Sequence, residues 1–284
     1  MQADNFEVLQ KLLKQRSGLV VSPEKAYLLE SRLMPVARKW SVKGLDELVA
    51  LVRTKNDERL LQDITESMTT NESSFFRDSR PFDLFKTVVL PQMMERRAAR
   101  RHLRIWCGAA STGQEPYSLA MILHEERAKL AGWRVEILGT DLATEVLAKA
   151  RDGIYSQFEV QRGLPITYLV KYFQQQGDKW LLSPEIRQMV EYKPFNLLND
   201  PSGLGRFDIV FLRNVLIYFD RPDKAAILGR VAKQMPSDGV LYLGGAETVF
   251  GISDRFKPVE GQRGLYEPVP ATGAATTPRQ AAVL

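Results

Sequence analysis

The chain contains a single cysteine, Cys107, and only two histidines among its 284 residues. One cysteine excludes an internal disulfide and a cysteine-rich zinc site, so we expect no metal centre. The same scarcity is compatible with the reducing cytoplasm, where we expect this protein to act.

Long hydrophobic runs are also missing. The most apolar stretch, residues 209–219, is too short to cross a bilayer and is interrupted by Arg213 and Asn214. The first ten residues carry Asp4 and Glu7 and lack a long apolar core, which argues against a signal peptide. We therefore expect no insertion into a membrane.

The composition that is present is that of an ordinary globular protein. Hydrophobic residues make up 44% of the chain and charged residues 26%, enough for one large domain or two small ones. Lysine and arginine outnumber aspartate and glutamate by 39 to 34, a net charge of +5. This excess favours an acidic partner, which could be nucleic acid, a membrane surface or an acidic protein.

Residues 103–118 have the pattern of a buried strand, a turn of small residues and the start of a helix. The segment 103–107 is apolar apart from Arg104, and residues 108–113 carry no side chain larger than threonine. Small residues allow a ligand to approach the backbone closely. A strand that leads through a glycine turn into a helix is typical of the nucleotide-binding corner of an open α/β sheet.

The residues after this turn restrict the ligand. A P-loop requires Gly-Lys-Ser/Thr, whereas Gly113 is followed by Gln114 and Glu115. A dinucleotide site would need glycine at Ala110. Because a carboxylate at a helix N-terminus repels phosphate, Glu115 favours a cationic adenosine ligand such as S-adenosylmethionine. Alternatively, Thr112 and Glu115 form a capping box that only starts the helix.

Two further strand ends carry polar side chains suited to a ligand. Asp141 closes the next predicted strand, at the separation from the glycine turn expected of an acid that holds ribose hydroxyls. Asp141 could equally cap the helix predicted over residues 142–151, and the two roles are compatible. Arg213 and Asn214 follow the strongest strand, residues 207–212, and functional residues of open α/β sheets gather at such carboxyl ends.

Hydrophobic periodicity divides the chain into a helical N-terminal part and an α/β part. Residues 4–62 show helical spacing without a strand signal. A small pair of antiparallel strands is predicted around the turn at Gly177 and Asp178. The predicted units are a helical domain (1–70), a linker and connecting helix (71–95), an α/β domain (96–268) with a small β-subdomain at about 172–195, and a disordered tail (269–284).

Five motifs occur in order along the chain. They are Thr70-Asn71-x-Ser73-x-Phe75-Phe76-Arg77, residues 109–118, Asp141, Asn196-Leu197-Leu198 and residues 213–219. Together they resemble the CheR-type chemotaxis receptor methyltransferases, from about residue 6 to residue 267. The resemblance implies a Rossmann-like, S-adenosylmethionine-dependent methyltransferase sheet with an all-helical N-terminal domain and a small inserted β-subdomain. This family methylates glutamate side chains on the helical cytoplasmic region of chemoreceptors.

The resemblance also implies a set of cofactor contacts. Arg77 would pair with the methionine carboxylate in a bidentate fork, Glu115 would take the ammonium, and Asp141 suits the ribose. Asn196 and the Leu197 amide suit the adenine edge. The full set of implied contacts is Asn71, Ser73, Arg77, Glu115, Asp141, Asn196, Leu197, Arg213 and Asn214.

Arg213 and Tyr218 are implied to lie near the methyl group, and we expect them to be catalytic. The family usually has threonine at Ser73 and glutamate at Gln114, and both differences keep a hydrogen-bonding group. Because the nucleophile would be a substrate carboxylate, already ionised at pH 7, no general base is required and catalysis would come mainly from alignment.

Three other reactive residues, two histidines and one cysteine, are expected to be structural in this chemistry. His102 lies in an arginine-rich run, and His124 lies on the helix that follows the glycine turn. Cys107 ends an apolar strand, which favours a buried packing residue over a nucleophile.

A basic helix is the expected docking surface. The second predicted helix carries Arg32, Arg38 and Lys39, which we expect to steer an acidic receptor helix, although such charges can also form only a solvated face. We expect a monomer that binds receptors and no nucleic acid. The hairpin at residues 174–180 is shorter than in family members that bind a receptor C-terminal peptide, so the sequence leaves open whether this protein binds such a peptide.

Two other functions are compatible with parts of the pattern. A nucleic-acid methyltransferase would carry an Asn/Asp-Pro-Pro-Tyr motif or a catalytic cysteine after a strand, and residues 213–216 offer neither. A non-catalytic sensory module would bind S-adenosylmethionine as a signal and would need no access for a second substrate.

Overall fold

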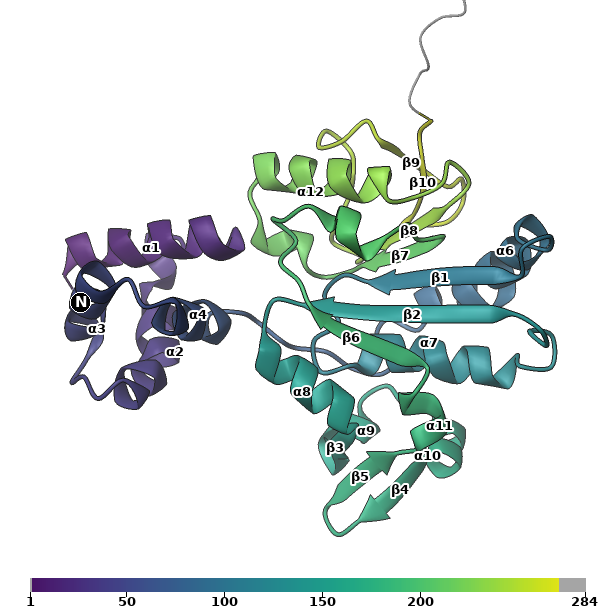
Figure 1. The fold of residues 1–284 in the computed structure, drawn as a ribbon, viewed down its shortest axis with the longest axis horizontal. Helices are drawn as coiled ribbons and strands as arrows, with labels where there is room; N and C mark the ends of the chain where they lie inside the picture. The colour runs from purple at the N-terminus through teal and green to yellow at the C-terminus, as the bar shows by residue number, and fades with distance from the viewer. Residues whose placement is uncertain (1, 271–284) are drawn as a thin grey trace, which may run out of the picture.

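The protein was analysed as a computed structural model, which describes residues 2–270 and shows a helical domain beside a sheet domain (Figure 1). Of the tail predicted to be disordered, residues 271–284 lie outside the described residues. No helix of the described part is long and apolar enough to span a bilayer.

The N-terminal domain consists of helices whose apolar faces meet in one core. Its elements are α1 (Ala3–Ser17), η1 (Pro23–Lys25), α2 (Ala26–Lys39), α3 (Leu45–Lys55) and α4 (Glu58–Ser67). Leucines at helical spacing, such as Leu9 and Leu13 on α1 and Leu29 and Leu33 on α2, are fully buried. This confirms the all-helical character predicted for the beginning of the chain.

A linker, residues 68–79, leads from this domain into a helix that runs along the sheet. The helix is built from α5 (Arg80–Leu84), the π-helical turn η2 (Phe85–Val89) and α6 (Leu90–Arg96). Phe82 and Phe85 are buried in the same core as the central strands. Their apolar contacts therefore hold the end of the linker against the sheet.

The main sheet has seven strands and is mostly parallel. In spatial order they are β6 (Val190–Pro194), β2 (Arg134–Asp141), β1 (His102–Cys107), β7 (Ile209–Leu212), β8 (Val240–Leu243), β10 (Leu265–Pro268) and β9 (Phe256–Pro258). The links from β6 to β8 are parallel, and β10 pairs antiparallel with β8 and β9. This order confirms the predicted Rossmann-like α/β class.

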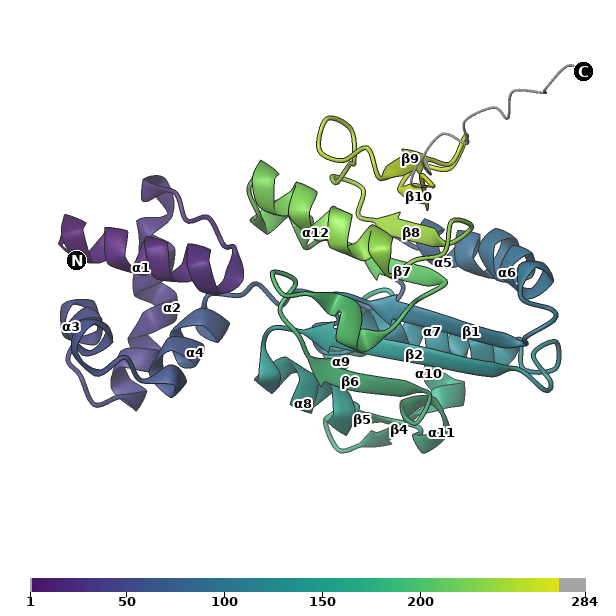
Figure 2. The same ribbon diagram turned by 45° about the horizontal axis from the view of Figure 1, so that its top comes forward.

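Side chains alternate between the two faces of the sheet and bury both. On β1, Ile105 and Cys107 belong to one core, whereas Trp106 belongs to the other. Helices α7 (Gln114–Glu125) and α8 (Thr144–Asp152) pack into the first core, and α12 (Arg221–Lys233) packs into the second (Figure 2). Short helical turns, η3 (Pro201–Leu204) and η4 (Leu216–Tyr218), flank β7.

A second, antiparallel sheet lies beyond α8 (Figure 1). Its elements are β3 (Ile154–Ser156), α9 (Gln157–Gln161), α10 (Ile166–Tyr172), β4 (Phe173–Gln176), β5 (Lys179–Leu182) and α11 (Pro184–Arg187). The hairpin predicted around Gly177 is present as β4 and β5. The structure differs from the predicted limits of about 172–195, because the small sheet begins at Ile154 and the last predicted segment is β6 of the main sheet.

Candidate functional site

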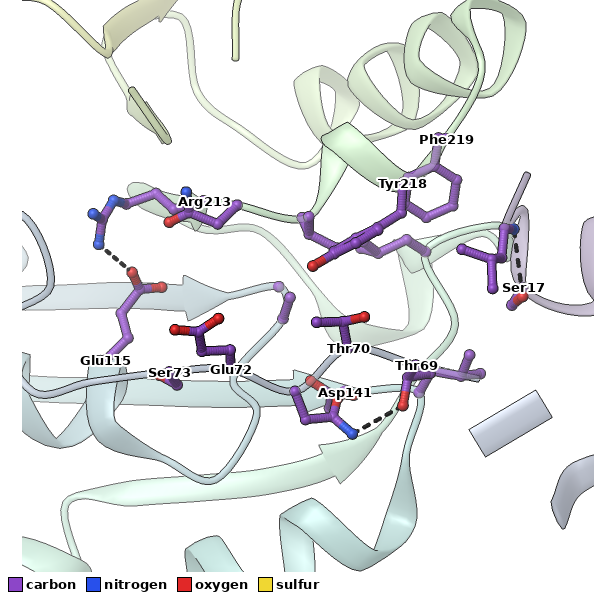
Figure 3. A pocket seen from close by; sticks show the side chains of 18 of the residues that line it. Ser17, Thr69, Thr70, Glu72, Ser73, Glu115, Asp141, Arg213, Tyr218 and Phe219 are labelled. Carbon is purple, nitrogen blue, oxygen red and sulfur yellow. Dashed lines mark hydrogen bonds and ion pairs between the residues drawn. The ribbon is translucent and has the colours of Figure 1, made fainter. Parts of the chain in front are cut away.

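A pocket lies at the carboxyl ends of β1, β2 and β7 (Figure 3). The linker 69–77 forms one side of it, and the C-terminal end of α1 contributes Ser17 and Leu19. All ten residues predicted for the cofactor or for catalysis line this pocket: Asn71, Ser73, Arg77, Glu115, Asp141, Asn196, Leu197, Arg213, Asn214 and Tyr218. Their individual roles stay predictions, but the fold does bring them together.

The glycine turn forms a tight corner above β1. The Gly108 N–H donates to the Phe211 carbonyl at 2.8 Å. Gly113 has a φ of 94°, and a Cβ there would lie 2.7 Å from the Tyr192 hydroxyl. Only glycine fits this position, because the left-handed backbone and the close approach both exclude a side chain.

The capping box considered for Thr112 and Glu115 is not formed. The Thr112 hydroxyl donates to the Gln114 side chain at 2.8 Å, and Gly113 is the N-cap of α7 without a side-chain hydrogen bond. Glu115 instead accepts a hydrogen bond from Arg213 at 2.7 Å. Its carboxylate therefore faces the pocket and a cation, and does not turn back to its own helix.

Arg213 is enclosed between acidic groups. Its guanidinium binds Glu115 on one side, and on the other it donates to the Asp78 carboxylate at 2.8 Å and the Arg77 carbonyl at 2.9 Å. Only 1% of the side chain is exposed. Burial raises the pKa of Glu115 above its ordinary value, and the neighbouring Arg213 opposes that shift.

The guanidinium of Arg213 has protein partners on both sides, and its expected place near the methyl group stays a prediction. Figure 3 shows its guanidinium turned toward Glu115, whereas the Tyr218 hydroxyl points into the pocket. The contacts of Arg213 are those of a residue that holds Glu115 in place. The role of Tyr218 toward a substrate stays a prediction.

Asp141 ends β2 and is held by two backbone N–H groups. One carboxylate oxygen accepts from Ser111 at 2.9 Å and the other from Ala143 at 3.0 Å. Ala143, and not Asp141, is the N-cap of α8, so Asp141 shapes the turn before the helix. Burial raises the pKa of Asp141, and these backbone hydrogen bonds counteract the shift.

The linker is held in an unusual backbone conformation beside the pocket. Phe76, Asp78 and Ser79 have positive φ angles of 49°, 66° and 44°. The Phe76 N–H donates to the Ser118 hydroxyl at 2.9 Å, and the Asn71 carbonyl accepts from Ser111. Positive φ angles in non-glycine residues cost free energy and are concentrated at functional sites. The surrounding structure therefore has to hold this segment in its strained conformation.

Asn196 joins the pocket to the helical domain. Its amide nitrogen donates to the Arg16 carbonyl at 2.5 Å, and its oxygen accepts from the Leu198 N–H at 3.0 Å. The carboxamide thus orients the 196–198 segment. Any contact to an adenine edge would use its remaining hydrogen-bonding capacity or the Leu197 backbone.

One buried acid at the site was not predicted. Glu247 accepts hydrogen bonds from the N–H groups of Asn214, Val215 and Gly244, at 2.7, 2.9 and 2.7 Å. It fixes the loop after β7, where Asn214 has a φ of 57°. An acidic residue at or shortly after the end of a buried strand was the feature that indicated Asp141, and the same feature could have indicated Glu247.

The predicted docking residues do not line the pocket and differ in their surroundings. Arg32 donates to the carbonyls of Met68 and Thr69 at 2.8 and 3.1 Å, and so binds the linker. Lys39 pairs with Asp63 at 2.8 Å. Arg38 is exposed, and no ion pair to it is found within residues 2–270. Docking at this helix stays a prediction, and Arg38 is the residue that suits it best.

The other reactive residues lie away from the pocket lining. His124 Nδ1 lies 2.9 Å from the Tyr172 hydroxyl, and His102 lies beside Glu136. Cys107 is fully buried, and burial raises the pKa of its thiol well above the ordinary value. A thiol kept protonated in a core is a poor nucleophile, as expected for a packing residue.

Charged side chains of both signs line the pocket. Three carboxylates line it, from Glu72, Glu115 and Asp141, together with the guanidinium groups of Arg77 and Arg213. This excess of negative charge suits a cationic ligand and opposes a phosphate. A Rossmann-like sheet with an acid after β2 and a pocket lined by carboxylates is the arrangement expected of the class of S-adenosylmethionine-dependent methyltransferases.

Comparison with known families agrees with this class. Residues 71–265 match the family described as CheR methyltransferase, SAM binding domain, and residues 4–69 match CheR methyltransferase, all-alpha domain. The chain belongs to the CheR methyltransferase family. S-adenosylmethionine is its cofactor.

Curated relatives extend over nearly the whole chain. Chemotaxis protein methyltransferase Cher2 of Pseudomonas putida is 37% identical over 92% of this chain and 96% of its own length. Chemotaxis protein methyltransferase 1 of Pseudomonas aeruginosa is 38% identical over the same shares. Chemotaxis protein methyltransferase 1 of Vibrio cholerae is 36% identical over 90% of this chain and 93% of its own.

Proposed function

We propose that this protein methylates glutamate side chains on the cytoplasmic region of chemotaxis receptors, forming methyl esters for sensory adaptation. The pocket geometry carries the proposal, because linker and strand-end residues of a CheR-type site meet in one place with an excess of carboxylates. The names of the relatives support chemotaxis as the setting. The reaction would take place in the cytoplasm, with the acidic helical region of a receptor as partner and the enzyme as a monomer.

The proposed roles follow from the chemistry of each side chain. Arg77 binds the methionine carboxylate, Glu115 the ammonium and Asp141 the ribose hydroxyls. Asn196 and the Leu197 backbone hold the adenine. These contacts would leave the reacting end of the cofactor near Tyr218.

Catalysis in this proposal depends on alignment. When bound, S-adenosylmethionine would supply an electrophilic methyl carbon on its sulfonium, so that a glutamate oxygen could bond to this carbon as the carbon–sulfur bond breaks and its electron pair stays on sulfur. The glutamate carboxylate is already ionised near pH 7, so no residue has to remove a proton. Tyr218 and the walls of the pocket would hold the carboxylate, the methyl carbon and the sulfur in line.

The test uses the purified protein, methyl-labelled S-adenosylmethionine and cytoplasmic fragments of receptors. We expect label on the receptor fragment that is released by mild base, as a methyl ester is. A receptor fragment with glutamines at the methylation positions is the matched control and should stay unlabelled. Base-stable label, label on added nucleic acid, or cofactor binding without transfer would contradict the proposal.

A further inference from the structure

α1 runs toward the sheet domain (Figure 1), and Ser17 at its end and Leu19 just after it line the pocket. α1 ends at Ser17, and Gly18 follows with a left-handed φ of 73°. A Cβ at Gly18 would lie 2.4 and 2.5 Å from two ring carbons of Phe219. Phe219 itself lines the pocket, so the absence of a side chain at Gly18 permits direct packing on a pocket wall.

Two hydrogen bonds accompany the contact between Gly18 and Phe219. The Val20 N–H donates to the Tyr218 carbonyl at 3.4 Å, and Asn196 donates to the Arg16 carbonyl at 2.5 Å. Both contacts join the end of α1 to backbone or side chains that form the pocket. Residues 196–198 and 218–219 are therefore both held by one segment of the helical domain.

An ion pair adds a charge contact one turn earlier on α1. Lys14 Nζ lies 2.6 Å from the Asp220 carboxylate and also binds Asp223. Asp220 is the N-cap of α12 and directly follows Phe219. Lys14 thus holds the start of α12, and with it the segment that carries Tyr218 and Phe219.

We propose that residues 14–20, the α1 C-terminal segment, form a wall of the cofactor site, with Lys14 and Gly18 as positioning residues for Tyr218 and Phe219. Cofactor binding and docking of the helical domain on the sheet domain are then linked: each strengthens the other by the same factor. Interfaces between domains of one chain are commonly weak, so such a linkage has a measurable effect. The inference rests on the proposed use of this pocket by the cofactor.

The first test changes Gly18 in the full chain. Gly18→Ala inserts a methyl group against Phe219, and we expect it to weaken binding of S-adenosylhomocysteine about tenfold in calorimetry. Gly261→Ala is the matched control, because its φ of 70° is equally left-handed but no atom lies within 4 Å of the added Cβ. The control should bind within about twofold of the parent.

The second test changes Lys14 and does not depend on backbone strain. Lys14→Met should weaken binding about two- to fivefold, as expected for a partly exposed ion pair, and Lys14→Arg should restore it. Lys11→Met is the control, because Lys11 is 74% exposed and its one ion pair within residues 2–270 is with Glu7 on its own helix. Equal binding by parent and Lys14→Met would contradict the charge contact.

Hydrogen exchange separates positioning from general stability. S-adenosylhomocysteine should slow exchange at residues 14–20 of the parent, and this protection should be smaller in Gly18→Ala at equal saturation. If the parent binds the ligand without protecting this segment, and Gly18→Ala binds like Gly261→Ala, the inference is wrong while the proposed function stands. If the parent binds no S-adenosylhomocysteine, the proposed function fails first.

Discussion

Arg77 and Asp141 are the residues whose removal tests the cofactor site most directly. Arg77→Ala and Asp141→Ala should each weaken S-adenosylhomocysteine binding by about 1.5–3 kcal/mol, because each loses a charge-assisted hydrogen bond. Within residues 2–270 the Arg77 side chain makes one hydrogen bond, to the Glu72 carbonyl at 3.1 Å, so its removal should disturb the fold little. Calorimetry measures the affinity and circular dichroism the helical content. Normal binding by both variants would show that the ligand lies elsewhere.

Tyr218 should matter more for turnover than for affinity. Tyr218→Phe removes only the hydroxyl that points into the pocket, and we expect kcat to fall several-fold while cofactor affinity changes by less than about twofold. Tyr27→Phe is the matched control, because Tyr27 is 65% exposed on α2. An unchanged kcat would assign Tyr218 to packing.

At the scale of elements, Glu247 couples the ends of β7 and β8. Its carboxylate accepts three backbone N–H groups, and glutamine would present an N–H where one acceptor is needed. Glu247→Gln should lower the free energy of unfolding by about 1–3 kcal/mol and weaken cofactor binding, because the Asn214 loop loses its support. Denaturant titration and calorimetry measure the two effects. Glu260→Gln, at an exposed position, should change neither.

The basic residues of α2 differ in their surroundings, because Arg32 contacts the linker and Arg38 is exposed to solvent. Arg32 holds the linker at Met68 and Thr69, so Arg32→Glu should weaken cofactor binding as well as receptor methylation. Arg38 is exposed, so Arg38→Glu should reduce the methylation rate at subsaturating receptor and leave cofactor affinity unchanged. Rates measured from low to moderate salt should converge for parent and Arg38→Glu, because exposed charges are screened beyond about 8 Å at physiological ionic strength.

Lys257→Glu is the control for this experiment, since it makes the same change in net charge on β9, in the other domain. It should methylate receptor at close to the parent rate at every salt concentration. If Arg38→Glu behaves like this control, α2 is not the docking surface.

At the scale of the whole molecule, residues of the helical domain, the linker and the sheet domain together line the pocket. The sheet domain supplies Glu115, Asp141 and Asn214, the linker supplies residues 69–74 and Arg77, and the helical domain supplies Ser17 and Leu19. The small sheet reaches the linker from the far side, where Arg162 pairs with Glu72 and a Cβ at Gly163 would lie 2.2 Å from the Phe75 carbonyl. The linker is therefore held by both neighbouring parts of the molecule.

The sequence by itself determined the class of the fold and part of the lining of the pocket, although not Ser17, Leu19 or Phe219. Alternating and helical periodicities show which face of a strand or helix is buried, and a glycine turn between a strand and a helix indicates a ligand-binding corner. Both signals lie within short stretches of sequence and can therefore be recognised without the structure. For the same reason Asp141, Arg213 and Asn214 could be singled out: each follows a strand, and parallel strands end at one edge of the sheet. The motifs resembling a known family added Asn71, Ser73, Arg77 and Asn196.

Only the tertiary structure decided which partner each side chain takes. Glu115 pairs with Arg213, 98 positions away, and so forms no capping box; Lys14 pairs with Asp223, 209 positions away. β6 lies at the edge of the main sheet, beside β2. Its alternating pattern would suit a strand of a hairpin equally well, so residues 190–194 alone could not predict this pairing. Contacts between distant residues depend on how whole elements pack, and no short stretch of sequence carries that information.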